Sequence, residues 1–171
     1  AFDKYPFPIP DYALPKGINP IPTGLSPSLE EVKKINMRET YVGIVSNHFV
    51  DKNEQMCPSS YMALISTAVP NILGQALSQV DASTVGGAAL EYSFNYKEFA
   101  TINTVITIRS GLEELTKKTF TWRHWLFNEK NGNLLADARA IVITLDLKRR
   151  KSVKMPQKMF DALNSILIKN I

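Results

Sequence analysis

The chain has 171 residues, of which 44% are hydrophobic and 21% charged, so its length suits one globular domain with an arm. No run approaches the roughly 18 uncharged apolar residues of a membrane span, and the first ten residues lack the basic and apolar regions of a secretory signal. We therefore expect no membrane span and a cytoplasmic location.

Cysteine and histidine are scarce, which limits the chemistry open to the chain. Cys57 is the single cysteine, so an internal disulfide is excluded and a reducing compartment fits. The two histidines, His48 and His124, show none of the usual zinc-ligand spacings, so we expect no metal and no cofactor. The formal net charge of +4 suits an acidic partner. Nucleic acid is not expected, because no basic face interleaved with stacking aromatic residues is present.

Proline dominates the start of the chain, where seven of the ten prolines lie in the first 27 residues. Because proline fixes φ and lacks a backbone donor, this segment is predicted to be an extended arm. Its aromatic residues argue against free disorder, and we expect it to lie along the domain or along a neighbouring subunit. Residues 26–31 combine hydroxyl side chains, an early proline and acids, which predicts a short helix ending near Asn36. Residues 1–36 thus precede a domain of residues 37–171.

The next predicted elements are a strand, a polar loop and a long helix. Residues 39–50 carry the strand signal and residues 51–55 the loop. One face of the strand is expected to carry Thr40, Val42 and Ile44. Pro58 opens a helix whose apolar residues recur at three- and four-residue steps, which predicts burial over most of its circumference. Pro70 lies inside this helix and is expected to kink or break it.

The remaining chain has the two-residue hydrophobic period of strands. The predicted strands cover residues 88–96, 101–112, 116–128 and 134–147. Asn131-Gly132 predicts a hairpin turn before the last of them. That strand carries a row of small residues, Ala136, Ala138 and Ala140, which would let a helix approach the sheet closely. After the basic residues 148–151, Pro156 opens a short C-terminal helix with an apolar face.

The order of elements predicts an α+β domain in which the sheet curls over the helix, because a flat sheet would leave apolar helix surface exposed. With the residues around Asp51, this layout resembles the hotdog-fold thioesterases of the 4-hydroxybenzoyl-CoA and acyl-carrier-protein thioesterase groups, over roughly residues 38–156. In those groups a strand runs into an acid, a loop and a helix with a Tyr ten positions after the acid, as Asp51 and Tyr61 are spaced here. The resemblance implies a hotdog fold, a curved antiparallel β-sheet wrapped around a long central helix, here with a proline-rich N-terminal arm and a short C-terminal helix.

The resemblance also implies a function, the hydrolysis of an acyl-CoA or acyl-carrier-protein thioester with Asp51 as base or nucleophile. It further implies a homodimer or higher homo-oligomer with each site built from two chains. In the acyl-carrier-protein group the loop reads acid, Asn, His and Asn at every second position, and here that run is Asp51, Asn53, Gln55 and Cys57. Gln55 can orient a water but cannot take its proton.

The 4-hydroxybenzoyl-CoA type of site needs only the acid and a backbone N–H at the helix start that polarises the thioester carbonyl. Pro58 stands where that donor is expected and has none, so the N–H of Cys57 or of Ser59 would serve. Tyr61 lines the acyl pocket or packs against the arm. Arg149 and Arg150 would pair with coenzyme A phosphates or an acidic carrier protein, or remain solvated.

Structural roles are the alternatives for the same residues. Asp51 is also a typical turn or capping residue, and Cys57 is either a nucleophile or a small packed side chain. His48 and His124 are expected to be structural. Two other functions stay open: a dehydratase-type hotdog enzyme, and a non-catalytic module that binds acyl thioesters or carrier proteins.

Overall fold

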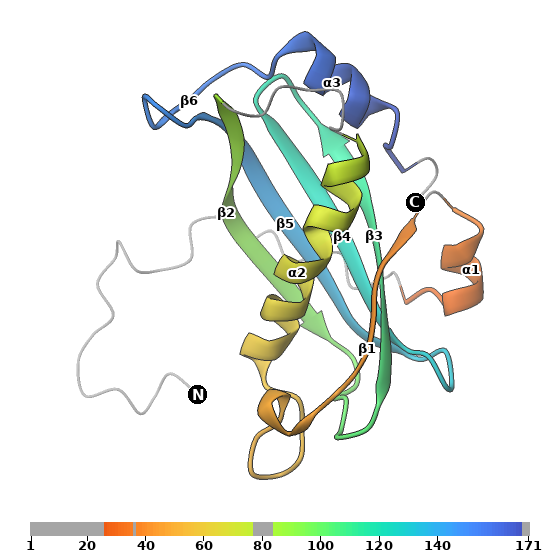
Figure 1. Cartoon of the computed structure of the whole chain (residues 1–171). Helices are drawn as coiled ribbons and strands as arrows, with labels where there is room; N and C mark the ends of the chain where they lie inside the picture. Colours follow the sequence, from red (N-terminus) through yellow and green to blue (C-terminus); the bar gives the residue numbers. More distant parts are fainter. Residues whose placement is uncertain (1–25, 36, 77–83, 169–171) are drawn as a thin grey trace.

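The protein is a curved antiparallel sheet crossed on its concave side by one long helix (Figure 1). A computed structural model describes residues 26–35, 37–76 and 84–168, so the predicted arm of residues 1–25 lies outside the described residues. The strands are β1 (Arg38–Ile44), β2 (Val85–Tyr96), β3 (Val105–Leu115), β4 (Thr119–Asn128), β5 (Leu134–Asp146) and β6 (Lys151–Ser152). Their order is β1-β3-β4-β5-β2, with the short β6 paired to β5. The predicted hotdog architecture is confirmed.

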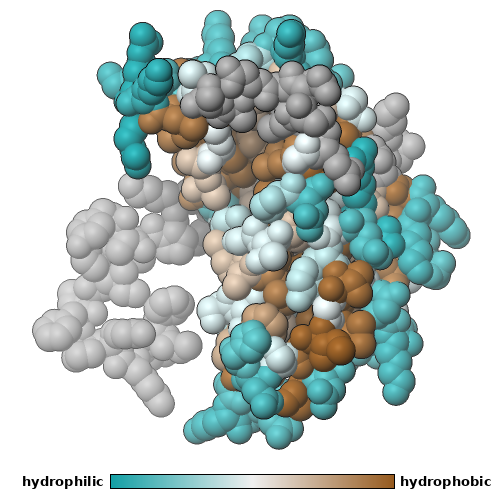
Figure 2. Space-filling model, in the orientation of Figure 1, coloured by the Kyte–Doolittle hydropathy of each residue, from teal (hydrophilic) through white to brown (hydrophobic). Residues whose placement is uncertain are grey.

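The long helix α2 (Pro58–Ala76) begins at the predicted proline and packs mainly against β1 and β3. Its buried side chains, three and four residues apart, are Tyr61, Leu64, Ile65, Ala68 and Ile72. The opposite side of the helix is exposed and includes Ser66, Thr67 and Asn71, and it is pale in the hydropathy view (Figure 2). Burial over most of the circumference was therefore wrong for this chain, because small and hydroxyl residues fill one face. Pro70 is exposed and does not end the helix.

A bulge in β1 separates Thr40 from the two residues that were expected to share its face. The pairing of β1 with β3 shifts register between Glu39 and Tyr41, so Thr40 is buried and bonded to β3. Val42 and Ile44, which were expected to share a face with Thr40, are 53% and 59% exposed. An extra residue in one strand of a pair inverts which side chains face the core. Apolar surface accordingly appears beside α2 on the side of β1 (Figure 2).

Two predicted strands begin later than expected because hydroxyl side chains close turns before them. Thr104 N–H donates to the Thr101 carbonyl at 3.1 Å, and the Thr104 hydroxyl accepts from Thr101 N–H, so β3 starts only at Val105. Ahead of β4, Thr116 N–H donates to the Thr119 carbonyl at 2.8 Å and Thr119 N–H donates to the Thr116 hydroxyl at 2.9 Å. The predicted turn at Asn131-Gly132 is present, with Gly132 at φ 73°.

Two short helices cover apolar residues on the two faces of β4. Helix α1 (Leu29–Lys33) begins with a capping box between Ser28 and Glu31 and ends slightly before the predicted Asn36. It buries Leu29 and Val32 in one cluster with Trp125 and Phe127 of β4. Helix α3 (Gln157–Asn164) follows Pro156 as predicted and packs Met159 and Leu163 with Phe120 and Trp122, from the other side of the same strand.

Candidate functional site

The loop that carries Asp51 is held by its own hydrogen bonds. It follows a single 3₁₀ turn, η3 (Asn47–Phe49), and a bridge between Val50 and Met56 closes its base. Asp51 Oδ1 accepts from the N–H groups of Asn53 at 2.8 Å and Gln55 at 3.1 Å. Asp51 Oδ2 has only a long contact with the Asn53 amide at 3.5 Å. One carboxylate oxygen thus shapes the turn, and the other, on an exposed side chain, remains open to a ligand.

The start of α2 offers one unbonded backbone donor. Cys57 N–H donates to the Phe49 carbonyl at 2.9 Å, so it is already engaged. The N–H of Ser60 bonds to the Cys57 carbonyl, and the Ser60 hydroxyl bonds to Phe49 O. Pro58 has no N–H. Ser59 N–H makes no hydrogen bond to any residue that the structure describes, which leaves it as the free donor of the first turn.

Tyr61 anchors the first turn of α2 to the strands beneath it. Its side chain is fully buried, and its hydroxyl accepts a hydrogen bond from Ala100 N–H at 3.0 Å. The ring meets Tyr96 of β2 edge-on at 5.2 Å between centroids. Burial raises the pKa of the Tyr61 hydroxyl, so it remains protonated at neutral pH. Tyr61 therefore places the start of α2 beside the end of β2.

Arg149 and Arg150 lie at the opposite end of the sheet from the Asp51 loop within one chain (Figure 1). They form the exposed turn between β5 and β6, where Asp146 Oδ1 accepts from the N–H groups of Lys148 and Arg149. Asp146 pairs with Val85, so this basic turn stands beside the start of β2. A single chain does not bring these arginines to Asp51.

The two histidines occupy different environments. His48 is exposed and within hydrogen-bond distance of the Ser46 hydroxyl. His124 is fully buried on the face of β4 that looks towards α2, and its Nδ1 lies 2.8 Å from the Ser110 hydroxyl. His124 Nε2 is buried without a hydrogen-bond partner among the described residues. The expected structural histidine is thus only half satisfied.

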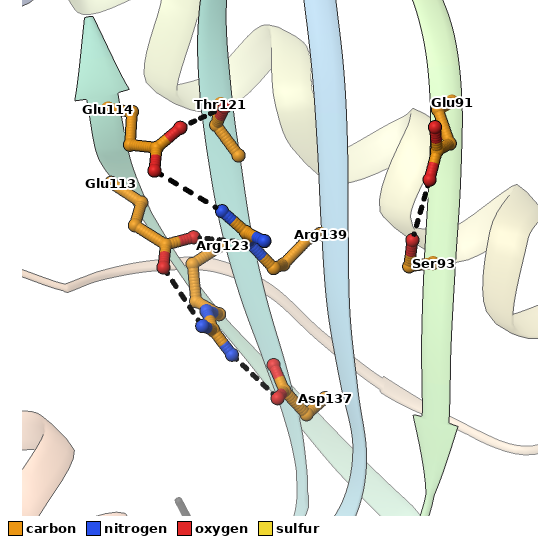
Figure 3. Close-up of polar contacts among 8 residues, drawn as sticks. All are labelled: Glu91, Ser93, Glu113, Glu114, Thr121, Arg123, Asp137 and Arg139. Carbon is orange, nitrogen blue, oxygen red and sulfur yellow. Dashed lines mark hydrogen bonds and ion pairs between the residues drawn. The ribbon is translucent and has the colours of Figure 1, made fainter. Parts of the chain in front are cut away.

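A cluster of charged side chains on the outer face of the sheet was not predicted from the sequence (Figure 3). Arg123 donates to Asp137 at 2.6 Å and to Glu113 at 2.9 Å, and Arg139 donates to Glu113 at 2.8 Å. Arg123 and Asp137 have side chains only 2% and 0% exposed. Burial raises the pKa of the Asp137 carboxyl, and the hydrogen bond from Arg123 offsets this only in part. Opposite charges at alternate strand positions were the available signal, and every carboxylate in the network has a basic partner.

Comparison with known proteins decides the family. The model of the thioesterase-like superfamily matches residues 45–163. The chain belongs to this superfamily. The matched segment includes the Asp51 loop, α2 and every strand except β1. A search of curated protein sequences found no match.

Solved structures of low sequence identity share the fold. A probable thioesterase from Escherichia coli, YbaW, superposes with a TM-score of 0.69 at 19% identity, covering 76% of this chain and 99% of that chain. A 1,4-dihydroxy-2-naphthoyl-CoA thioesterase from Synechocystis gives 0.63 at 14% identity, covering 72% and 93%. A hypothetical protein from Staphylococcus aureus, solved in complex with CoA, gives 0.67 at 16% identity, covering 75% and 84%.

No helix of the described residues is long and apolar enough to cross a membrane. Within the same residues, no group of three or more His, Cys, Asp or Glu side chains is arranged to hold a metal ion.

Proposed function

We propose that this thioesterase-like protein hydrolyses acyl thioesters at the loop between β1 and α2, with Asp51 as base or nucleophile. The observation that carries the proposal is the pairing of an open carboxylate oxygen on Asp51 with an unbonded Ser59 N–H at the start of the helix that follows. A carboxylate and a free backbone donor are the two parts that thioester cleavage needs. The backbone N–H groups of Asn53 and Gln55 hold the Asp51 carboxylate. The side chains of these two residues belong to the same loop and would orient substrate or water.

In the base form of the reaction, Asp51 takes a proton from water and the hydroxide oxygen bonds to the acyl carbon. The Ser59 N–H stabilises the resulting oxyanion, the C–S bond breaks, and the leaving sulfur takes the proton from Asp51. In the nucleophile form, Asp51 itself bonds to the acyl carbon, the C–S bond breaks with release of the thiolate, and water later cleaves the anhydride to the free acid and the Asp51 carboxylate. Gln55 and Cys57 take no proton in either form.

Coenzyme A thioesters are the substrates we favour. The relatives that share the fold include a naphthoyl-CoA thioesterase and a protein solved with CoA, and the net charge of +4 suits the CoA phosphates. An acyl carrier protein, also acidic, is the competing thiol carrier. Comparing hydrolysis rates on the same acyl group carried by CoA and by carrier protein separates the two.

A homodimer would bring the basic turn to the Asp51 end. The edge of β2 away from β5 pairs with none of the described strands, and Leu90 on it is 60% exposed. Long, apolar free edges favour pairing with a second chain. Antiparallel pairing of two β2 strands sets the start of one beside the end of the other. Since Arg149 lies at the start of β2 and Tyr61 at its end, the partner's arginines would reach this chain's substrate.

The decisive experiment compares thiol release from acyl-CoA by wild type and Asp51→Asn. The Asn side chain keeps an oxygen for the Asn53 and Gln55 N–H groups, so the turn survives while the charge is lost. We expect kcat to fall by about 100-fold or more. Asn53→Ala removes a neighbour without removing the carboxylate, and serves as the control with a smaller loss. Unchanged hydrolysis by Asp51→Asn would refute the assignment.

A binding module without catalysis is the second candidate. It is favoured by the engagement of Asp51 Oδ1 in the turn and by Gln55, Cys57 and Pro58 at positions where the resemblance implies His, Asn and a backbone donor. Tight acyl-CoA binding with no thiol release at any acyl length would select this function. A dehydratase-type reaction lacks support, since the loop carries no histidine. A cytoplasmic location stays a prediction.

A further inference from the structure

A chain of hydrogen bonds, called the relay below, lies inside the concave face and ends at a nitrogen that has no partner among the described residues. Thr40 of β1 lies 2.8 Å from the Ser110 hydroxyl of β3, and Ser110 lies 2.8 Å from His124 Nδ1 of β4. The Thr40 hydroxyl also donates to the Ile108 carbonyl at 3.2 Å. All three side chains in the relay are buried, and His124 Nε2 makes no hydrogen bond with the described residues.

The relay fixes which nitrogen of His124 carries the proton. Thr40 and Ser110 each have one hydroxyl proton, and the Ile108 carbonyl has none to give. When the Thr40 hydroxyl donates to the Ile108 carbonyl, the Ser110 hydroxyl must donate to Thr40. The contact between Ser110 and His124 is then a hydrogen bond only if His124 Nδ1 carries a proton and donates it to the Ser110 oxygen. Every contact in the relay is satisfied in this arrangement alone. His124 Nε2 is therefore a bare acceptor, and burial keeps the ring neutral, with a pKa of about 3.

A row of neighbouring side chains marks a route across the sheet from β2 to His124. Directly paired residues share a face of the sheet. Across the strands the row runs Phe94, Ala138, His124 and Ser110. Phe94 is half-buried at the edge strand, and the single residue between it and His124 is an alanine.

Aromatic rings connect this route to the start of α2. Phe94 stacks on Tyr96 at 5.6 Å, and Tyr96 touches Tyr61 in the first turn of the helix. The relay itself meets α2 much further along, because Asn71 donates to the Thr40 carbonyl at 2.7 Å. Asn71 stands 13 residues after Pro58, which is about 20 Å along the helix axis. The path from Tyr61 over Tyr96 and Phe94, and then across two strand spacings to His124, is about 20 Å, so a group that follows it is a long chain.

We propose that His124 Nε2 accepts a hydrogen bond from a hydroxyl group carried far along the acyl chain, so that long-chain hydroxyacyl thioesters are the substrate class. The inference rests on the proposed hydrolysis at Asp51 and adds the distal specificity contact. A buried acceptor without a partner disfavours an unsubstituted chain beside it, whereas a hydroxyl donor satisfies it. Ser110 and Thr40 act as positioning residues, since they touch only the relay.

Hydrolysis of paired CoA thioesters tests the contact. The series carries one hydroxyl at successive positions along a long acyl chain, each beside the unsubstituted chain of the same length. We expect one region of the chain to give a kcat/KM about tenfold or more above its unsubstituted partner. His124→Asn keeps a donor for Ser110 at the place of Nδ1 and lacks Nε2. It should bring that ratio to about one. A flat series, or a preference that survives His124→Asn, overturns the proposal.

Nitrogen NMR of the wild-type imidazole gives a readout that needs neither hydrolysis nor a variant. The ¹⁵N shifts should show a proton on Nδ1 and a bare Nε2, and free hydroxy fatty acid should move the Nε2 signal while the unsubstituted acid does not. If thiol release fails but this shift occurs, the hydrolase proposal falls and the hydroxyl site stands. A proton on Nε2, or a signal already bonded to water that no hydroxy acid changes, overturns the site.

Discussion

Burial of His124 couples the stability of the fold to pH. The pKa of the imidazole falls from 6.5 to about 3 in the folded protein because the ring is desolvated. The unfolded chain binds a proton below pH 6.5 and the folded chain does not until about pH 3, so stability is lost as the pH falls through this window. We expect the loss from this residue to approach about 1.4 kcal/mol per pH unit.

Urea unfolding of wild type and His124→Asn between pH 7 and pH 4 measures this contribution. Acidic residues titrate in both proteins, so their effect cancels in the difference between the two free energies of unfolding. That difference should favour wild type most at pH 7 and shrink towards acid. Parallel curves across the range would mean that His124 takes up a proton in the folded state.

At the scale of single residues, the sequence predicted which element carries each candidate residue better than it predicted the hydrogen bonds that the residue makes. The spacing of Asp51 and Tyr61 located the loop and the first turn of α2 correctly, because a polar run before a proline and hydroxyl cap is a local signal. Three other features depend on the path of the backbone and could not be predicted. Asp51 Oδ1 closes its own turn, Cys57 N–H is already bonded, and Ser59 N–H is free of the described residues. His124 was expected to be structural, and Ser110, its one hydrogen-bond partner among the described residues, lies 14 residues away on another strand.

At the scale of strands, β3, β4 and β5 are joined by the charged network on their outer face (Figure 3). Replacing Asp137 by Asn leaves the buried Arg123 guanidinium without its shortest ionic partner. We expect the free energy of unfolding to fall by about 1.5–3 kcal/mol, because a buried charge-assisted hydrogen bond is lost while Glu113 still pairs with Arg123. Chemical denaturation followed by tryptophan fluorescence reports the change, since Trp122 and Trp125 lie on β4.

Glu114→Gln is the matched control for Asp137→Asn. Glu114 belongs to the same network but is 63% exposed and 3.6 Å from Arg139, so its removal should cost at most about 1 kcal/mol. Equal losses in both variants would show that the network acts as one unit rather than through the buried Arg123–Asp137 pair.

Helix and strand identity followed from periodicity, and the errors arose where one local feature altered it. The bulge at Thr40 inverted the faces of β1 without changing its composition, so an alternating pattern alone could not reveal it. The late starts of β3 and β4 arise from threonine hydroxyls that cap turns, although threonine also favours strands. α2 is less buried than its apolar residues predicted, because Ser66, Thr67 and Asn71 occupy an exposed face between them.

At the scale of the whole molecule, two edges compete as the contact between chains. Leu90 on β2 and Val42 on β1 are 60% and 53% exposed, so each edge strand shows apolar surface. If chains pair through β2, Leu90→Lys should weaken the dimer, because a lysine on an edge strand opposes pairing. Val42→Lys, the control of similar exposure, should leave the mass unchanged. Sedimentation velocity over a range of concentrations distinguishes the two, and dissociation by Val42→Lys alone would transfer the interface to β1.

Pairing through β2 has a further consequence for activity, because it places the Asp51 of one chain with the Arg149 and Arg150 of the other. Asp51→Asn and a double variant, Arg149→Ala with Arg150→Ala, should each be impaired at low acyl-CoA concentration. When the two are refolded together, half of the dimers are mixed, and each mixed dimer contains one site with both defects and one with neither. Thiol release should then rise to about a quarter of the wild-type value. If instead the arginines served the Asp51 of their own chain, every site in the mixture would keep one defect, and no activity would return.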